Sequence, residues 1–525
     1  MSPRLPFLFL AAVLGGGVVA ASAEGARPVL LTTPPPVAGV AAPVASAADA
    51  SASTWYCAGG TATERGFADH HVVVVNPTDD EADGYVTVFP GRLDTDPMPA
   101  GRTDGRADRE PTGRGFTVAA RGRASIRLAD LRSASLASAL VELDRGGMVV
   151  EHQVVGPHGR DVAPCASGAA SDWHFAWGST ARDARELLVL FNPFASSVTI
   201  DAAFATEAGV REPLRWQGLT VPAHGVLGVD VGRDVTRRGQ VAATIRARGG
   251  GRLVVDRLQV FDGSAGRDGL SLALGQPDGV EMSVFAHGLV DDRTAEQIVV
   301  YNPGRETAEV EVVVRATGAE RLAPQPFGVV VRLAPQPFGV VVRPGRFEVV
   351  DYTEEDRVPR GVEHTTVVRS RNGVPFVAER ALSARGDLST TPGALFGATT
   401  WVAAVADRGS GAATRLVVAN LDPDHAVEVS VAVYADGDRL RPTDLQQLEV
   451  PAAARLVVSL SGRGEMAARP SPPGSGSGGQ GSQDGLAAVV VAEGPVVVER
   501  VIARDDTVIA AGPATPAAEG LEPLP

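Results

Sequence analysis

The histidines and cysteines of this chain are the side chains that most readily bind metals or take part in acid–base and nucleophilic chemistry. The nine histidines are scattered, and no two of them have the spacing of the His-Glu-x-x-His zinc motif. Two cysteines are too few for a zinc site made only of cysteine or for an iron–sulfur cluster. The sequence therefore predicts no catalytic residue, no metal site and no cofactor.

The charged residues exclude further classes of mechanism and partner. The chain has no lysine, which excludes Schiff-base and P-loop lysine mechanisms. The 62 acidic residues outnumber the 48 basic ones, and the net charge of −14 argues against nucleic acid or an anionic membrane as a partner. Carboxylate pairs that cleave glycosidic bonds could be drawn from so many acids, but no spacing singles out one pair.

Cys57 and Cys165 enclose a loop of over a hundred residues. In an exported chain two cysteines most economically form one disulfide. That bridge would add up to about 4–5 kcal/mol of stability in the chain-entropy model. A pair of free reactive thiols is the alternative, but neither cysteine lies in a nucleophile motif or in Cys-x-x-Cys. We predict the disulfide.

An internal repeat is the most informative pattern in the sequence. Four of the five asparagines end an apolar run rich in β-branched residues, at spacings of 116, 110 and 118 residues. An Asn side chain can bond its own backbone in an Asx turn, and a following proline prevents the strand from continuing. We interpret these positions as structural turns rather than ligands. They are Asn76-Pro77, Asn192-Pro193, Asn302-Pro303 and the looser Asn420-Leu-Asp-Pro.

Each repeat also ends in an apolar strand that carries an acid followed directly by a base. Neighbouring residues on a strand point to opposite faces of the sheet, so the two members cannot pair with each other. We expect ion pairs between repeats rather than catalysis. The dipeptides are Glu151-His152, Asp256-Arg257, Glu379-Arg380 and Glu499-Arg500.

Aromatic residues make up only 5% of the chain, which weakens a sugar-binding interpretation. An aromatic residue stands 17 to 21 positions before each repeated asparagine, and this position is expected in the core. Trp177 and Trp216 have no equivalents in other repeats, so they are the better candidates for surface aromatics, although burial is favoured for each. The recurring aromatics are Trp55, Trp173, Phe285 and Trp401.

Within each repeat the apolar residues recur with a period of two, as in 308–314, and Gly/Pro turns follow about every 8–12 residues. A repeat is too long for a propeller blade of about 40–50 residues, but it suits an immunoglobulin-like sandwich. The predicted fold is all-β, with about four tandem immunoglobulin-like β-sandwich domains. Their predicted bounds are 54–168, 169–280, 281–397 and 398–508.

The segment 1–23 has the pattern of a signal peptide, with an apolar run and the cleavage pattern Ala21-Ser22-Ala23. An uncleaved signal anchor is the alternative. Residues 24–53 are predicted to be a Pro/Ala-rich linker, 470–485 a flexible Gly/Ser loop within the fourth domain, and 509–525 a disordered tail. We predict a secreted or envelope-associated, extracytoplasmic protein without an internal membrane span.

An eleven-residue segment occurs twice without change, as Arg321–Val331 and Arg332–Val342. Without one copy, the third repeat would be close to the second in length. We interpret the duplication as an extra hairpin or long loop, with the risk of an exposed apolar edge.

The whole pattern resembles a family of actinobacterial secreted, repeat-containing proteins of unknown function. The resemblance rests on the signal segment, on Trp55-Tyr-Cys57-Ala-Gly-Gly, on the Asn-Pro strand ends and on the acid–base strands, and it covers about residues 54–508. It implies a non-catalytic role in the cell envelope, as a scaffold or an array of binding modules. Cell-wall polysaccharide or an envelope protein is the expected partner. The alternatives are an exported carbohydrate-active hydrolase that uses Asp or Glu and an array of carbohydrate-binding modules.

Overall fold

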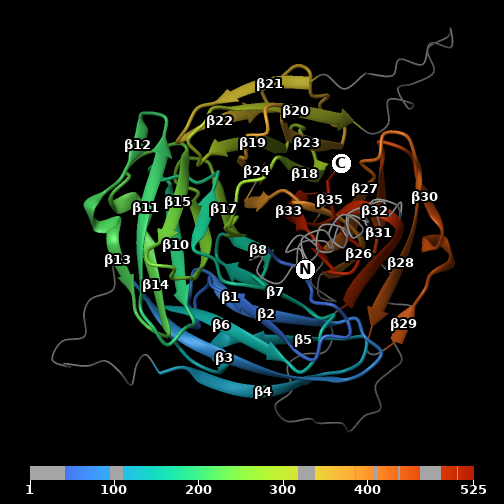
Figure 1. Ribbon diagram of the computed structural model, residues 1–525, viewed down its shortest axis with the longest axis horizontal. Helices are drawn as coiled ribbons and strands as arrows, with labels where there is room; N and C mark the ends of the chain where they lie inside the picture. The colour runs from blue at the N-terminus through green and yellow to red at the C-terminus, as the bar shows by residue number, and fades with distance from the viewer. Residues whose placement is uncertain are drawn as a thin grey trace, which may run out of the picture. The chain divides into compact units, whose positions relative to one another are not determined.

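Valine-rich segments with a period of two form strands throughout the computed structural model (Figure 1), because β-branched side chains pack well on a pleated sheet. The model describes residues 42–94, 110–316, 337–384, 386–405, 412–435, 438–460, 486–504 and 507–524. Over these ranges the chain is all-β, with short 3-10 turns and no α-helix. The signal segment, most of the linker, the Gly/Ser loop and the first copy of the duplicated segment lie outside the described residues.

Repeat 1 (54–168) folds into two antiparallel sheets that share one core. The first sheet has the order β5 (Gly122–Arg127), β2 (Asp69–Asn76), β7 (Val149–Gly156), β8 (Gly159–Pro164). The second has the order β1 (Ser53–Cys57), β6 (Leu136–Leu143), β3 (Ala82–Leu93), β4 (Thr112–Val118), and the turn η2 is Leu128–Asp130.

Repeat 2 (169–280) has the same two strand orders. The first sheet runs β14 (Gly225–Asp230), β10 (Ala184–Asn192), β16 (Val254–Asp262), β17 (Asp268–Leu274). The second runs β12 (Gly209–Arg211), β11 (Val198–Thr206), β15 (Val241–Ala247), β9 (Asp172–Phe175), with β13 (Gln217–Val221) also on β11. The 3-10 turns are η3 (Leu214–Trp216) and η4 (Val231–Arg233). A parallel pairing of β14 with β3 joins the repeat to repeat 1.

Repeat 3 (281–397) again consists of two sheets of this kind. The first runs β22 (Arg346–Asp351), β19 (Thr294–Asn302), β24 (Val377–Ala384), β25 (Asp387–Pro392). The second runs β18 (Met282–Gly288), β23 (His364–Ser370), β20 (Ala308–Ala316), β21 (Pro337–Val342). Strand β21 lies within the second copy of the duplicated segment and pairs with β20 on one side.

Repeat 4 uses one long strand, β32 (Leu486–Arg504), in both of its sheets. The first sheet runs β31 (Arg455–Ser459), β27 (Ala413–Ala419), β32, β33 (Thr507–Pro513). The second contains β26 (Phe396–Ala404), β32, β28 (Val427–Ala435), β29 (Asp438–Leu440), β30 (Leu448–Val450), and the turn η6 is Thr443–Leu445.

The predicted disordered tail is wrong. Strand β33 pairs with β32, while β34 (Thr515–Pro516) and β35 (Leu521–Pro523) pair with β26. The end of the predicted linker is also ordered, because Ala45 bridges to Ala517. These short segments gain backbone hydrogen bonds from sheet edges that lie far away in the sequence, which local composition does not reveal.

The four asparagines end equivalent strands and make equivalent bonds. Each side chain is buried, donates from Nδ2 to backbone carbonyls and accepts the backbone N–H two residues later through Oδ1. Asn420 follows this pattern even though Leu-Asp-Pro replaces the adjacent proline. The buried amide therefore closes a turn in each repeat.

The same pairing register aligns the acid–base strand with the asparagine strand in each repeat. In every repeat the base lies opposite the residue four positions before the asparagine, and the acid is opposite the residue that follows. The pairs are Val72 with His152, Leu188 with Arg257, Ile298 with Arg380 and Leu416 with Arg500. Each acid and base is thus held at a fixed height in its sheet.

Deleting one copy of the duplicated segment (321–331) should leave the fold and its stability nearly unchanged, because an identical copy remains to form β21. The shorter connection before β21 should lower the loop-closure entropy by about 0.6 kcal/mol or less. Guanidinium unfolding of both proteins measures the difference.

Deleting both copies (321–342) is the matched control. It removes the buried side chains of Phe338 and Val342 and strips β20 of its edge partner. We expect a loss of several kcal/mol, of the order found for large core truncations. A single-copy deletion as damaging as the double one would contradict the equivalence of the two copies.

Candidate functional site

The acid–base strands meet at the junctions between repeats, where every one of their charged side chains is buried. At each junction the base of one repeat faces the acid of the next. Repeat 4 in turn meets repeat 1, so the series of contacts closes on itself. Residues Gly39–Pro525 form one compact unit.

The junction between repeats 2 and 3 shows the geometry. Nη1 of Arg257 lies 2.8 Å from Oε2 of Glu379 and also donates to the carbonyl of Trp177. The other oxygen of Glu379 accepts the backbone N–H of Ala176 at 3.1 Å. Burial raises the pKa of Glu379, although the adjacent Arg257 opposes the shift. The carboxylate thus bonds both a side chain and the backbone of the preceding repeat.

The next two junctions repeat this arrangement. Arg380 pairs with Glu499, whose second oxygen accepts the backbone N–H of His287 at 2.7 Å. Arg500 pairs with Glu151 and donates to the carbonyl of Ala404 at 3.0 Å. The Ala404 backbone N–H in turn donates to Glu151 at 3.4 Å. Charge-assisted bonds of this kind hold consecutive repeats at a fixed register.

The junction between repeats 1 and 2 departs from the pattern, because His152 and Asp256 stand in place of an arginine and a glutamate. Nε2 of His152 lies 3.6 Å from Oδ2 of Asp256. That oxygen also accepts the backbone N–H groups of Ala58 at 3.0 Å and Gly59 at 2.7 Å. On its other side His152 contacts His70, with 2.9 Å between Nδ1 and Nε2.

Burial disfavours the charged forms of the residues at this junction. It raises the pKa of Asp256 to about 7, against the hydrogen bonds from Gly59 and Ala58. Burial lowers the pKa of His70 to about 4 and that of His152 well below its usual value. Both imidazoles are therefore uncharged at neutral pH.

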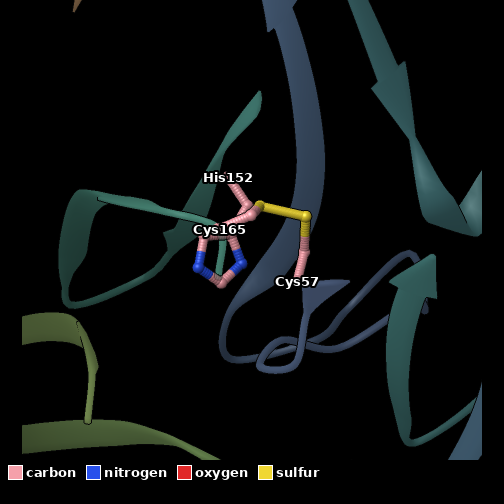
Figure 2. A group of neighbouring side chains, drawn as sticks. All are labelled: Cys57, His152 and Cys165. Carbon is pink, nitrogen blue, oxygen red and sulfur yellow. A yellow bond between two sulfur atoms is a disulfide. The ribbon is translucent and has the colours of Figure 1, made fainter. Parts of the chain in front are cut away.

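The disulfide lies at this same junction. Cys57 on β1 and Cys165 after β8 are joined by an S–S bond of 2.05 Å, and Figure 2 shows the imidazole of His152 beside them. Both cysteines are fully buried. Among the described residues, their sulfur atoms and a ring nitrogen of His152 lie within 4.8 Å of one another.

The last strands of the four first sheets, β8, β17, β25 and β33, lie against one another. Figure 1 labels three of them, β8, β17 and β33, near the middle of the view. A chain of buried hydrogen bonds crosses β25, β17 and β8. Arg257 donates to Thr390 at 2.8 Å, Thr390 contacts Ser271 at 2.5 Å, and Ser271 donates to Asp161 at 2.9 Å. Burial raises the pKa of Asp161 to about 8, although bonds from Leu272, Val162 and Ser271 oppose this shift.

A mainly apolar cavity of about 60 Å³ lies where these four strands end. All four repeats contribute equivalent segments to its wall, and Ala42 and Pro43 from the predicted linker line it as well. The carbonyl of Ala42 accepts a hydrogen bond from Ser167 at 2.6 Å. The lining segments are 162–164, 272–277, 390–396 and 512–514, with Trp401 and Pro516.

A larger cleft, of about 740 Å³, lies in repeat 4. Its wall carries carboxylates from three separate segments of the chain. Backbone N–H groups of Asp424 and His425 bond Asp422 and lower the pKa of its carboxyl. The titratable residues of the wall are Asp422, Asp424, His425, Glu493 and Glu522.

Glu186 is a further buried acid that the sequence analysis did not single out. Neither of its oxygens has a hydrogen-bond partner, and a Cβ at Gly178 would lie 2.6 Å from Oε1. Burial raises the pKa of Glu186 to about 8, with Arg257 opposing and Glu379 adding to the shift. The carboxyl is therefore protonated at neutral pH.

Its position recurs and could have been found from the sequence. The residue six places before the repeated asparagine is buried in all four repeats, and three of the four are ionisable. These residues are His70, Glu186, Glu296 and Thr414. A titratable residue at one place in an otherwise apolar strand was the available signal.

The two tryptophans without equivalents in other repeats are buried, as the sequence analysis favoured for each. Trp177 is 4% exposed and Trp216 is 0% exposed. Arg257 stacks over the Trp177 ring at 5.5 Å, and the indole N–H of Trp216 donates to Asp234. Neither ring can serve as a sugar platform, because another part of the chain already covers it.

Phe285 also occupies a different place from the recurring tryptophans. Isolated bridges make Tyr56, His174 and Val284 equivalent positions, so Phe285 aligns with Phe175 rather than Trp173. Both phenylalanines accept an arginine over their rings, Arg257 at Phe175 and Arg380 at Phe285. The sequence spacing of the aromatic marker in repeat 3 was therefore misleading.

A family of unknown function, DUF5719, matches residues 156–326, which is less than half of the chain. No curated protein matches it. Among the described residues no helix is long and apolar enough to cross a membrane.

Two solved structures each align with about a fifth of the chain. A Thermotoga maritima protein, 1070, is 16% identical, covers 22% of this chain and 95% of its own, with a TM-score of 0.18. The Anabaena sensory rhodopsin transducer is 20% identical, covers 19% of this chain and 94% of its own, with a TM-score of 0.14.

Replacing Arg257 by Met should cost about 3–5 kcal/mol, because it leaves Glu379 buried without its cation. The double variant Arg257→Met with Glu379→Gln should recover more than half of that loss. Guanidinium unfolding at pH 7 measures all three proteins. Purely additive losses would show that the two groups are not coupled.

The matched control is Arg357→Met, which breaks an exposed pair with Glu355. Solvent screens that pair, so its loss should be much smaller than that of Arg257. Equal losses at the two sites would contradict a special role for the buried junction.

Glu186→Gln should change how stability depends on pH. The folded state holds the Glu186 proton more tightly than the unfolded chain does, so its contribution is complete below pH 4.5 and is lost as pH rises towards about 8. The slope is at most about 1.4 kcal/mol per pH unit for one group. The variant should lose less stability than the parent between pH 5 and pH 8.

Unfolding by denaturant at several pH values in that window tests this expectation. Glu348→Gln, which changes an exposed acid on β22, is the control and should leave the slope unchanged. A Glu186→Gln protein with the parent's pH profile would show that this carboxyl is ionised in the folded state.

Proposed function

We propose that this protein is an exported, non-catalytic component of the cell envelope, a four-repeat frame that binds cell-wall polysaccharide or an envelope protein. The observation that carries the proposal is the closed series of buried acid–base contacts between repeats. The acid and base that recur in each repeat pair across the junctions and hold neighbouring repeats together. Such a frame can present loops from all four repeats in a constant arrangement.

Export is supported by the signal-like segment 1–23 and by the disulfide, which forms and persists in oxidising compartments. Two sheets around a shared core in a repeat support the finer proposal of immunoglobulin-like sandwiches. Arginine-only basic residues and the motif pattern support the actinobacterial family resemblance.

The burial of Trp177 and Trp216 redirects the search for a sugar-binding surface. Carboxylates bond sugar hydroxyls well, and the cleft in repeat 4 gathers Asp424, Glu493 and Glu522, which are all exposed. The proposed contact surface for a wall polysaccharide is therefore this cleft.

The same cleft supports the second candidate function, a carbohydrate hydrolase. A glycosidase needs one protonated and one ionised carboxyl. The backbone N–H groups that lower the pKa of Asp422 suit it to the ionised role of base or nucleophile, not to that of the acid. Glu493 and Glu522 are then the candidates for the acid.

Co-sedimentation of the purified protein with isolated cell-wall polysaccharide, with an assay for sugar released into the supernatant, separates the two functions. Binding without release is the expected result. The variants Asp424→Asn, Glu493→Gln and Glu522→Gln should weaken binding about tenfold or more if each loses a charge-assisted bond. Asp292→Asn, an exposed acid in repeat 3, is the matched control and should bind as the parent does.

Sugar release that Glu493→Gln or Glu522→Gln abolishes would replace the binding function by the hydrolase. If the protein neither binds the polysaccharide nor releases sugar from it, polysaccharide is ruled out as the partner. Crosslinking in living cells would then identify an envelope protein.

A further inference from the structure

The repeat pattern breaks at one junction, and the disulfide lies at that junction. Three junctions use an arginine and a glutamate, whereas His152 and Asp256 take their place between repeats 1 and 2. Cys57, Cys165 and His152 are each fully buried there. An imidazole, a carboxyl and two sulfur atoms are the side chains that bind zinc.

The spacing of the donor atoms suits one metal ion. The two sulfur atoms and a ring nitrogen of His152 all lie within 4.8 Å of one another. Donors around tetrahedral zinc lie roughly 3.7 Å apart, given Zn–S bonds of about 2.3 Å. The sulfur atoms of Cys57 and Cys165, which are 2.05 Å apart in the disulfide, therefore have to move apart to reach ligand positions.

The hydrogen bonds fix the form of the imidazole. The carbonyl of Ala137 can only accept, so the Nδ1 of His70, 2.8 Å away, carries a hydrogen. Neutral His70 then accepts at Nε2 from Nδ1 of His152. Neutral His152 is left with a lone pair on Nε2. This is the tautomer in which histidine binds a metal, with its other nitrogen bonded to a second group.

Two polar atoms at the junction have no partner. Nε2 of His152 and Oδ1 of Asp256 are buried and make no hydrogen bond. Buried polar groups without partners are uncommon, because each costs free energy. Both atoms belong to the residues that depart from the arginine–glutamate pattern, which points to a group that these residues accommodate.

We infer that, once the disulfide is reduced, this junction binds one zinc-like divalent cation through Cys57, Cys165 and His152, the three residues whose donor atoms lie together. A dithiol supplies two electrons and two protons, becomes a cyclic disulfide itself and leaves two thiols. The cation then displaces both thiol protons to solvent as two metal–thiolate bonds form. Two thiolates neutralise the divalent charge, which suits a buried site.

The metal-bound form would connect one more strand than the disulfide does. The disulfide joins β1 to the residue after β8, whereas His152 lies on β7, which pairs with β8. A cation at this place would hold the closing strands of repeat 1 together. The two states are alternative crosslinks at one position, selected by the redox conditions.

The test is a Co²⁺ titration of the full chain after reduction with a phosphine. We expect one Co²⁺ per chain, a thiolate charge-transfer band that excess Zn²⁺ abolishes, and a higher melting temperature with Zn²⁺. The oxidised protein should show none of these effects. The variants Cys57→Ser and Cys165→Ser should each lose the band.

The matched control is His152→Arg combined with Asp256→Glu, which installs the pair found at the other three junctions and keeps both thiols. Its affinity for Co²⁺ should fall about a hundredfold or more, since the imidazole ligand is lost and only the two thiolates remain. Equal binding by this variant would overturn the assignment. Reduced parent protein that stays folded by near-ultraviolet circular dichroism but binds no Co²⁺ would also overturn it.

If reduction unfolds the parent, refolding with and without Zn²⁺ decides the question. Recovery of protease resistance only with Zn²⁺ supports the site, and recovery that is independent of Zn²⁺, or absent with it, refutes it. These readouts do not depend on polysaccharide binding, so the proposed function and the metal site can fail separately.

Discussion

The pairing of buried charged side chains between consecutive repeats is the constraint on which the structure depends. An ionised side chain removed from water needs a partner, and a repeat cannot supply one for itself because its acid and base point to opposite faces. Glu379 is paired with Arg257 of repeat 2, and Arg380 with Glu499 of repeat 4. Separating the repeats would therefore break these pairs and expose the charged groups to water. The same requirement explains why repeat 4 must meet repeat 1, where Arg500 reaches Glu151.

The junction of repeats 1 and 2 satisfies the constraint in a different way. His152 lies beside the disulfide, and burial disfavours the charged forms of both His152 and Asp256. Neutral groups need weaker partners than ions do, but they still need hydrogen bonds. Nδ1 of His152 is hydrogen-bonded to His70, while Nε2 of His152 has no hydrogen-bond partner. This junction thus combines covalent closure with incompletely satisfied polar atoms.

The buried acids give the molecule a reserve of bound protons close to neutral pH. Burial raises the pKa values of Asp161 and Glu186 to about 8, and both residues lie inside the folded repeats. Backbone hydrogen bonds lower the pKa of Asp422, which lies in the wall of the cleft in repeat 4. The environment thereby shifts the pKa values of buried and surface carboxylates in opposite directions.

The residues by themselves determined much of this protein. A period of two in valine-rich segments established the all-β class, the asparagine spacing located equivalent turns, and two cysteines left one economical pairing. Each of these depends on local backbone preference or on a simple count. The acid–base dipeptides were located for the same reason, since alternation on a strand excludes pairing within a dipeptide.

Only the tertiary structure decided which groups meet. Arg500 and Glu151 are 349 residues apart, and no local pattern ranks that pair above others. Glu186 was not singled out as a buried acid, and 509–525 looked too rich in Pro and Ala to be ordered. In each case a distant strand supplies the covering surface or the hydrogen bonds. Burial depends on how sheets pack, which a sequence specifies only through the whole fold.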